Sequence, residues 1–178
     1  GSAFGSIGLG SANNQKYFDS LLWERLEELS GASLIAVEAE SKRIGMSILP
    51  DFFLNAMAEG THILLQRSLQ ARIDQIYQEY SKTYQQDKSA FIERTIESIQ
   101  AVKKHIIQKI SKTGYQKLLT HCRKGNLKKV IEILLTKYYD PLYQHSQQQH
   151  NNFSLLVQED DLTAAATKVL EFSNSLTD

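Results

Sequence analysis

The sequence has little of the material from which disulfide-rich, collagen-like or membrane-spanning proteins are built. Its 178 residues include one cysteine, two prolines and nine glycines. One cysteine excludes a disulfide framework and a multi-cysteine zinc site, and the low proline content excludes a proline-rich linker. No apolar run approaches the roughly 20 residues that a membrane helix needs. Residues 1–10 carry neither a basic nor a long apolar stretch, so we expect no signal peptide, no membrane partner and a cytoplasmic protein.

A charge excess of one sign is absent overall but present locally. The 20 basic and 20 acidic residues give a formal net charge of zero, which excludes a uniformly basic or acidic protein. Residues 103–137, however, hold ten Lys and Arg residues and one acid, Glu132, so their net charge is +9. Residues 1–102 carry −4 and residues 138–178 carry −5. Such a local excess is typical of a surface that binds a polyanion.

Two short apolar runs, at residues 34–37 and 63–65, have the pattern of strands that are buried on both faces of a parallel sheet, and residues 153–157 are a candidate third strand. A helix is predicted before the first run, another between the first two runs, and a closing helix after the last. The residues that would begin these helices are Asn13 or Asn14, Pro50, and Asp160 or Asp161.

Between residues 68 and 138 the apolar residues recur at helical spacing. An isoleucine stripe over 92–110 predicts one long helix, Gly125 ends the helix after it, and Asn126 caps the next. The order of elements predicts a helix-rich α/β fold, in which a parallel sheet of two or three short strands carries a large α-helical insertion and a closing helix. The predicted boundaries are 1–68 for the α/β segment, 69–147 for the insertion and 148–178 for the returning strand and helix.

Two carboxylates follow the first predicted strand. Glu38 and Glu40 lie on one face of it, because side chains alternate along a strand. At the carboxyl end of a parallel strand, such groups point into the crevice where open α/β sheets bind ligands. They would orient a cation or a donor molecule there. The alternative is that both are solvated acids of a loop.

Four cations follow the first two predicted strands, Lys42 and Arg43 after one, Arg67 and Arg72 after the other. Cations at strand ends suit a phosphate or diphosphate, and arginine offers it a two-pronged match. Because parallel strands end at the same sheet edge, we predict that the four side chains converge on one anion site. The alternative is surface charge with local ion pairs. The sequence contains no glycine-rich phosphate loop of the Walker type.

The ten cations of residues 103–137 lie on predicted amphipathic helices, so they can gather opposite the apolar stripe. We predict that this face binds nucleic acid, and that tyrosines just after it stack on exposed bases. The alternatives are a solvated helix face and tyrosines that only pack the insertion. The residues predicted to contact RNA are Lys103, Lys104, Lys109, Lys128, Lys129, Tyr139 and Tyr143.

The sequence identifies no catalytic residue and no metal site. His121 and Cys122 are adjacent, but neighbours on a helix do not form a nucleophile–base pair, so we interpret Cys122 as a structural thiol. The five histidines show no metal-ligand spacing.

Four segments carry a family resemblance through their order and spacing. They are GSAFG at residues 1–5, VEAESKRIG at 37–45, Leu49-Pro50 with the helix that follows, and YYDPLY at 138–143. Together they resemble the tRNA 2-selenouridine synthase family, from residue 1 to about residue 146 and more weakly beyond. The acidic run ending in Arg-Ile-Gly is the most specific element.

The resemblance implies a P-loop-type sheet that is only partly present. Family members join an N-terminal rhodanese domain, which holds the reactive cysteine, to a P-loop-type domain that opens with a glycine-rich phosphate loop. Neither segment is in this sequence, and Cys122 does not match the rhodanese cysteine. The chain would then be a C-terminal portion, inactive alone, whose partners are those segments and the anticodon region of tRNA.

The resemblance also implies an activity. Family enzymes replace sulfur with selenium in wobble 2-thiouridine of tRNA, and S-geranylation of that thiouridine is associated with them as an intermediate step. Selenophosphate and geranyl diphosphate would be co-substrates, with no permanently bound cofactor. Two alternatives remain: a non-catalytic helical module on a degenerate P-loop scaffold, which binds RNA or protein, and a relative of the small nucleotide kinases.

Overall fold

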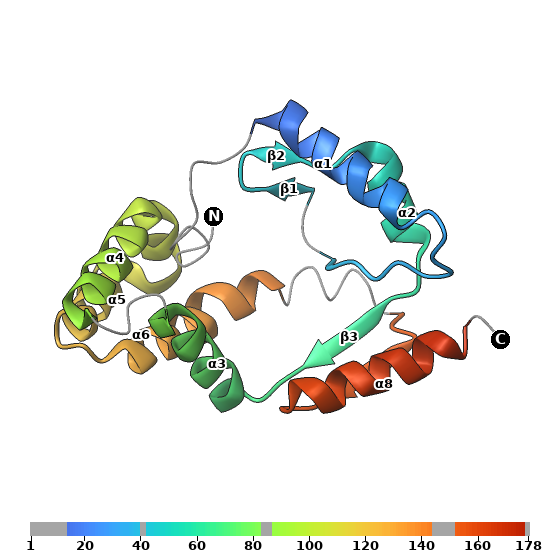
Figure 1. Cartoon of the computed structure of the whole chain (residues 1–178). Helices are drawn as coiled ribbons and strands as arrows, with labels where there is room; N and C mark the ends of the chain where they lie inside the picture. Colours follow the sequence, from blue (N-terminus) through green and yellow to red (C-terminus); the bar gives the residue numbers. More distant parts are fainter. Residues whose placement is uncertain (1–13, 40–41, 83–86, 144–151, 177–178) are drawn as a thin grey trace. The chain divides into compact units, whose positions relative to one another are not determined.

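The computed structural model describes residues 14–39, 42–82, 87–143 and 152–176 (Figure 1). They fall into two compact units. The α/β unit is built from the described residues of 11–66 and 152–178, and the helical unit from those of 67–151. Glu40, the glycine-rich start, the alternative cap Asn13 and the Gln-rich segment 144–151 lie outside the described residues. No helix in the described part of the chain is long and apolar enough to cross a membrane.

The α/β unit begins with α1 (Gln15–Glu28), which Asn14 caps by accepting a hydrogen bond from the Tyr17 N–H at 3.0 Å. A short antiparallel hairpin follows, formed by β1 (Arg43–Ile44) and β2 (Ser47–Ile48). Its two-residue turn places Gly45 at φ +61°, a conformation that glycine adopts without steric cost. The sequence pattern gave no signal for this hairpin, because each strand is only two residues long.

A parallel strand pair forms the sheet of the α/β unit. The predicted strands at 63–65 and 153–157 are confirmed as β3 (Ile63–Gln66) and β4 (Leu155–Gln158), which pair in register from Ile63 opposite Leu155. The expected burial of the 63–65 strand on both faces is wrong, since Leu65 is 57% exposed. Helix α2 (Asp51–Glu59) leads into β3 (Figure 1). Helix α8 (Leu162–Asn174) packs against β4. The chain therefore has the predicted helix-rich α/β fold with a small parallel sheet.

The prediction of a strand at 34–37, the first of the three candidate runs, is wrong. This run has no regular secondary structure, and its large side chains, Leu34, Ile35 and Val37, are 44–47% exposed. An apolar run becomes a strand only when the N–H and C=O groups of a neighbouring strand pair with it. No strand among the described residues pairs with this run. The predicted ligand crevice required Glu38 to lie at the end of a sheet strand. Glu38 therefore does not have the predicted position.

The helical unit consists of α3 (Leu69–Lys82), α4 (Lys88–Ala101), α5 (Lys103–Arg123), α6 (Leu127–Leu134) and the π-helix η1 (Leu135–Tyr139). Helix α5 packs against α4, α6 and η1, and α3 packs against α6. The cluster of buried residues between them is Ile73, Ile99, Ile106, Tyr115, Leu118, Leu119, Cys122, Val130, Ile131, Leu134, Leu135 and Tyr138.

The predicted continuous helix over 92–110 is two helices. The backbone leaves helical geometry at Val102, and α5 is also kinked at Ser111, where φ is +69° and ψ is 168°. The Ser111 hydroxyl accepts a hydrogen bond from the Gly114 N–H at 3.2 Å, so Ser111 caps the second part of α5. The isoleucine stripe survives the break, since Ile99 and Ile106 are both fully buried. Periodicity reports which face is buried and not whether the helix axis is continuous.

Candidate functional site

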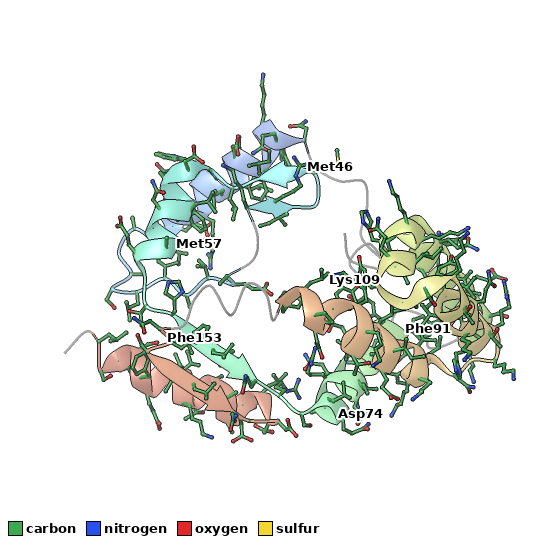
Figure 2. The ribbon with its side chains drawn as sticks, turned by 180° about the vertical axis from the view of Figure 1, so that it is seen from behind. Met46, Met57, Asp74, Phe91, Lys109 and Phe153 are labelled. Atoms are coloured by element: carbon green, nitrogen blue, oxygen red, sulfur yellow. The ribbon has the colours of Figure 1, made fainter. Side chains whose placement is uncertain are left out.

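The strongest concentration of charge is the basic face of α5, α6 and η1. In the second part of α5 the apolar side chains recur at positions 115, 118, 119 and 122 and face the core. This spacing leaves Lys117, which lies between them, on the opposite face. All ten cations of the segment are exposed, including Lys109, labelled in Figure 2. The segment therefore folds into helices that present their positive charge to solvent.

Only two of these ten cations form salt bridges within the described part of the chain. The Lys128 Nζ lies 2.6 Å from an Asp74 oxygen, and the Lys129 Nζ lies 2.7 Å from a Glu132 oxygen. Hydrogen bonds from Gln70 and then from Lys128 lower the pKa of Asp74. Of the five lysines predicted to contact RNA, Lys103, Lys104 and Lys109 have no such acidic partner among the described residues. The readily available charge therefore lies mainly on α5.

The tyrosines after the basic helices differ in exposure. Tyr138 is buried, and its ring lies edge-on to that of Tyr139 with centroids 4.9 Å apart. Burial raises the pKa of Tyr138, so its hydroxyl stays neutral well above physiological pH. Tyr139 is half-buried and packs against the core, whereas Tyr143 is 49% exposed. Of the two tyrosines predicted to stack on bases, Tyr143 is thus the more exposed to solvent.

Two of the three predicted anion-binding arginines, Arg67 and Arg72, lie near the start of α3, and both have protein partners. Arg67 donates a hydrogen bond to the Gln75 side chain. Arg72 donates two hydrogen bonds to Asp140, at 2.5 and 3.2 Å, and forms a bidentate ion pair. Both side chains belong to the helical unit. The sequence could not have identified Asp140 as a partner, because it is 68 residues from Arg72.

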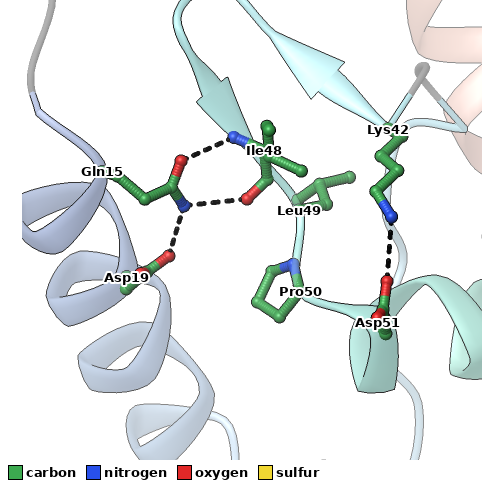
Figure 3. A pocket seen from close by; sticks show the side chains of 7 residues that line it. All are labelled: Gln15, Asp19, Lys42, Ile48, Leu49, Pro50 and Asp51. Atoms are coloured by element: carbon green, nitrogen blue, oxygen red, sulfur yellow. Dashed lines mark hydrogen bonds and ion pairs between the residues drawn. The ribbon is translucent and has the colours of Figure 1, made fainter.

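The other two predicted anion-binding cations, Lys42 and Arg43, belong to the α/β unit. Lys42 lines an open hollow of about 360 Å³, and its Nζ lies 2.9 Å from an Asp51 oxygen (Figure 3). Arg43 and Glu38 are exposed outside the hollow. The full lining is Gln15, Asp19, Lys42, Ile48, Leu49, Pro50 and Asp51. The convergence of all four cations on one site stays a prediction, since they are divided between the two units.

Gln15 is a residue of this hollow that sequence reasoning missed. Its side-chain oxygen accepts from the Ile48 N–H at 2.8 Å, while its nitrogen donates to the Ile48 carbonyl at 2.9 Å and to Asp19 at 2.7 Å (Figure 3). The pair of backbone contacts fastens α1 to β2. A glutamine at the start of a helix has no distinguishing pattern, and its partner is 33 residues away.

The described residues contain no group of acids, histidines or cysteines that could hold a metal ion. Cys122 is fully buried, and burial raises its pKa to about 11. A thiol with this pKa is almost entirely protonated at neutral pH, and the thiolate is the nucleophilic form. Cys122 is therefore a core residue.

Comparisons with known proteins point to one family over most of the chain. Residues 1–171 match the family described as the tRNA 2-selenouridine synthase AAA domain. A curated tRNA 2-selenouridine synthase of Shewanella loihica is 28% identical over 163 residues, which cover 82% of this chain and 44% of that protein. One of Shewanella pealeana is 28% identical over 168 residues, with 82% and 45% covered. One of Shewanella halifaxensis is 30% identical over 138 residues, with 65% and 36% covered.

The chain spans less than half the length of these curated relatives. No solved structure matches it. The family match extends over nearly the whole chain and includes the basic helices, the tyrosine segment and the hollow beside Lys42. The chain therefore belongs to the tRNA 2-selenouridine synthase family.

Proposed function

We propose that this chain holds tRNA for an enzyme that converts wobble 2-thiouridine to 2-selenouridine with selenophosphate, with S-geranylation from geranyl diphosphate as an intermediate step. The observation that carries the proposal is the exposed basic face of α5 and α6 in a chain of this family. The face would contact the anticodon region of tRNA. Selenium transfer itself would need residues outside this chain.

Electrostatics support a polyanion on this face. Each phosphate that a lysine neutralises releases condensed counterions, and this release drives binding. Eight of the ten cations form no salt bridge with a described residue, so few internal pairs would have to break. A face that served only to keep the protein soluble would interleave acids with its lysines, whereas residues 103–137 contain one acid.

The donor molecule would bind through the cations that were predicted to form an anion site, and not through those of the basic face. Lys42 is the best placed, because it lines a hollow and its pair with Asp51 is exposed on both sides. Exposed pairs contribute little, so a phosphate oxygen can replace the carboxylate at small cost. Arg43 would assist within the same unit, and Glu38 or Glu40 would orient the donor. Arg67, in the helical unit, stays a separate candidate for a phosphate contact. In the intact enzyme, Lys42→Ala should therefore weaken donor binding.

The test of tRNA binding is charge reversal on α5. In the intact protein, we would replace Lys103, Lys104 and Lys109 by glutamate and measure tRNA affinity at salt concentrations from about 50 to 200 mM. A plot of the logarithm of the binding constant against the logarithm of the salt concentration has a negative slope, and loss of three phosphate contacts should reduce its steepness by about 2 to 3. The same loss should raise Kd at least tenfold. Lysine and glutamate have similar helix propensities, so the helices should persist.

The matched control reverses three exposed cations of the α/β unit, Lys16, Arg25 and Lys168, and so changes the net charge equally. It should leave the slope unchanged. If the α5 variant keeps full affinity and an unchanged slope while circular dichroism shows it folded, the RNA proposal is wrong. The basic face would then serve a protein partner or solvent.

A second measurement concerns activity. The chain alone, incubated with thiolated tRNA and selenophosphate and then digested to nucleosides, should give no 2-selenouridine. Appearance of the selenated nucleoside would mean that these residues contain the selenium-transfer chemistry, contrary to the proposal.

A further inference from the structure

Arg72 has a bidentate protein partner in the structure. Its two guanidinium nitrogens donate to the two carboxylate oxygens of Asp140, at 2.5 and 3.2 Å. Both side chains are only about 30% exposed, at 31% and 29%. Paired, charge-assisted hydrogen bonds of this kind are about twice as strong as neutral ones and define the relative orientation of the two groups. The pair therefore joins α3 to the segment that follows η1.

Asp140 has two roles at the end of η1. Its backbone N–H donates to the Leu135 carbonyl, five residues earlier, and so closes the π-helical turn. Its side chain accepts from Arg72. Single-turn π-helices are rare, since their hydrogen bonds are less favourable than those of an α-helix, and they occur frequently at functional sites. The Arg72–Asp140 pair supplies a tertiary contact at the residue that closes this turn.

A second ion pair joins α3 to the opposite end of α6. Asp74, two residues after Arg72, contacts Lys128 in the first turn of α6, and the Lys128 Nζ also lies 5.4 Å from the Tyr77 ring centre. The continuous segment from α6 through η1 is thus held against α3 at both ends. The Arg72–Asp140 pair is the more buried of the two. Water therefore screens the Arg72–Asp140 pair less than it screens the Asp74–Lys128 pair.

We propose that Arg72 is a positioning residue that acts through Asp140 to hold Tyr143 as a stacking surface for an unpaired base of the tRNA. This inference rests on the proposed function. Tyr143 lies three residues after Asp140, about one helical turn along, and the residue is 49% exposed. Single-stranded RNA is commonly held by stacking on tyrosine rings, and this contribution varies little with salt. Arg72 itself contacts no phosphate.

Asp140→Asn in the intact protein gives opposite outcomes for the two roles of Arg72. If Arg72 positions Tyr143, loss of the carboxylate weakens tRNA binding by about tenfold at every salt concentration, as expected for one stacked base, and leaves the salt slope unchanged. If Arg72 instead binds phosphate and Asp140 only masks it, removing the acid strengthens binding and steepens the slope by about one. The second result would overturn the proposal.

The matched control is Glu132→Gln, which removes the acid of an exposed pair on α6 without touching η1. It should free Lys129, strengthen binding and steepen the slope by about one. If the α5 charge reversal changes tRNA binding but Asp140→Asn does not weaken it, the positioning role fails while the proposed function stands. If neither variant changes binding, the proposed function fails as well.

Two further variants separate positioning from a loss of folding. Tyr143→Ala should weaken binding as much as Asp140→Asn, and combining the two should cost no more than either alone. The reversed pair, Arg72→Asp with Asp140→Arg, should restore affinity and thermal stability together. Additive losses from Tyr143 and Asp140 would contradict the proposal. A reversed pair that is folded but still binds tRNA weakly would contradict it too.

Discussion

The two units of this chain differ in how many of their hydrophobic side chains are buried. Among the described residues, the helical unit buries 14 hydrophobic side chains and exposes three large ones, whereas the α/β unit buries three and exposes 15. Their charges differ as sharply. Residues 67–151 hold 15 basic and seven acidic residues, a net charge of +8, and the remainder of the chain carries −8. One sequence thus encodes a well-packed basic unit and a loosely packed acidic one.

The difference follows from how far apart the contacting residues lie in the chain. In the helical unit, α4 packs on α5 and α5 on α6, so consecutive helices complete one core. In the α/β unit, the sheet joins Ile63 to Leu155 across 92 positions, and the two-stranded sheet leaves Leu65 and Leu156 exposed. Contacts between chain neighbours cost little loop-closure entropy, whereas a two-stranded sheet buries little apolar surface. The helical unit should therefore supply most of the stability.

The largest expected effect tests this directly. Leu134→Ala, at a fully buried position of the helical unit, should lower the free energy of unfolding by about 3 to 5 kcal/mol, because it leaves a cavity in the core. Leu65→Ala, at a strand position that is 57% exposed, should cost less than about 1 kcal/mol. Urea unfolding measures both. Equal losses would mean that the two units depend on their apolar residues to the same degree.

The next effect is a pH dependence of the helical unit. The pKa of Cys122 is about 11 in the folded protein and about 9 when the thiol is solvated. Between pH 9 and pH 11 the folded state keeps the thiol proton that the unfolded state has lost, so this contribution to the free energy of unfolding is fully present below pH 9. Between pH 9 and pH 11 the free energy of unfolding should then fall by about 1.4 kcal/mol per pH unit. Cys122→Ala should remove this part of the dependence in urea unfolding at pH 8 to 10.5. Burial also raises the pKa values of Tyr80, Tyr115 and Tyr138, so a loss in the same direction should remain above about pH 10 in that variant.

A smaller effect should be the same in both units. Asn14 and Asp161 cap helices of the α/β unit, and Ser111 caps the second part of α5. Replacing any one of them by alanine should cost about 1 kcal/mol, because each accepts one backbone hydrogen bond at a helix start. Thermal unfolding of the three variants measures this. A cap that cost far more in one unit would show that local terms, and not only core packing, separate the units.

The smallest effect concerns exposed ion pairs. Asp51→Asn in the α/β unit and Glu132→Gln in the helical unit each break a pair that is largely solvated. Both should change stability by less than about 0.5 kcal/mol. A clear stability loss in Asp51→Asn would mean that the pair holds the hollow together and that Lys42 is not available to a ligand.

Short-range features were predictable from the residues because their partners lie within one helical turn or one short turn. The caps at Asn14 and Asp161 and the helix end at Gly125, where φ is +70°, follow from side-chain and backbone chemistry over three or four positions. The strands at 63–66 and 155–158 were predicted from the apolar runs at 63–65 and 153–157. The basic character of α5 needed only residue counts and helical spacing. The sequence could therefore locate the candidate RNA-binding face.

The sequence by itself determined which segments are apolar, which are charged and where most helices begin and end, since these depend on neighbouring residues. Only the tertiary structure decided that 34–37 is not a strand, that the helix predicted over 92–110 breaks at Val102 and that Arg72 is paired with Asp140. The first and the third of these outcomes depend on groups that are distant in the chain. A pattern read along one chain carries no information about which distant groups will meet, because that is set by the packing of whole elements.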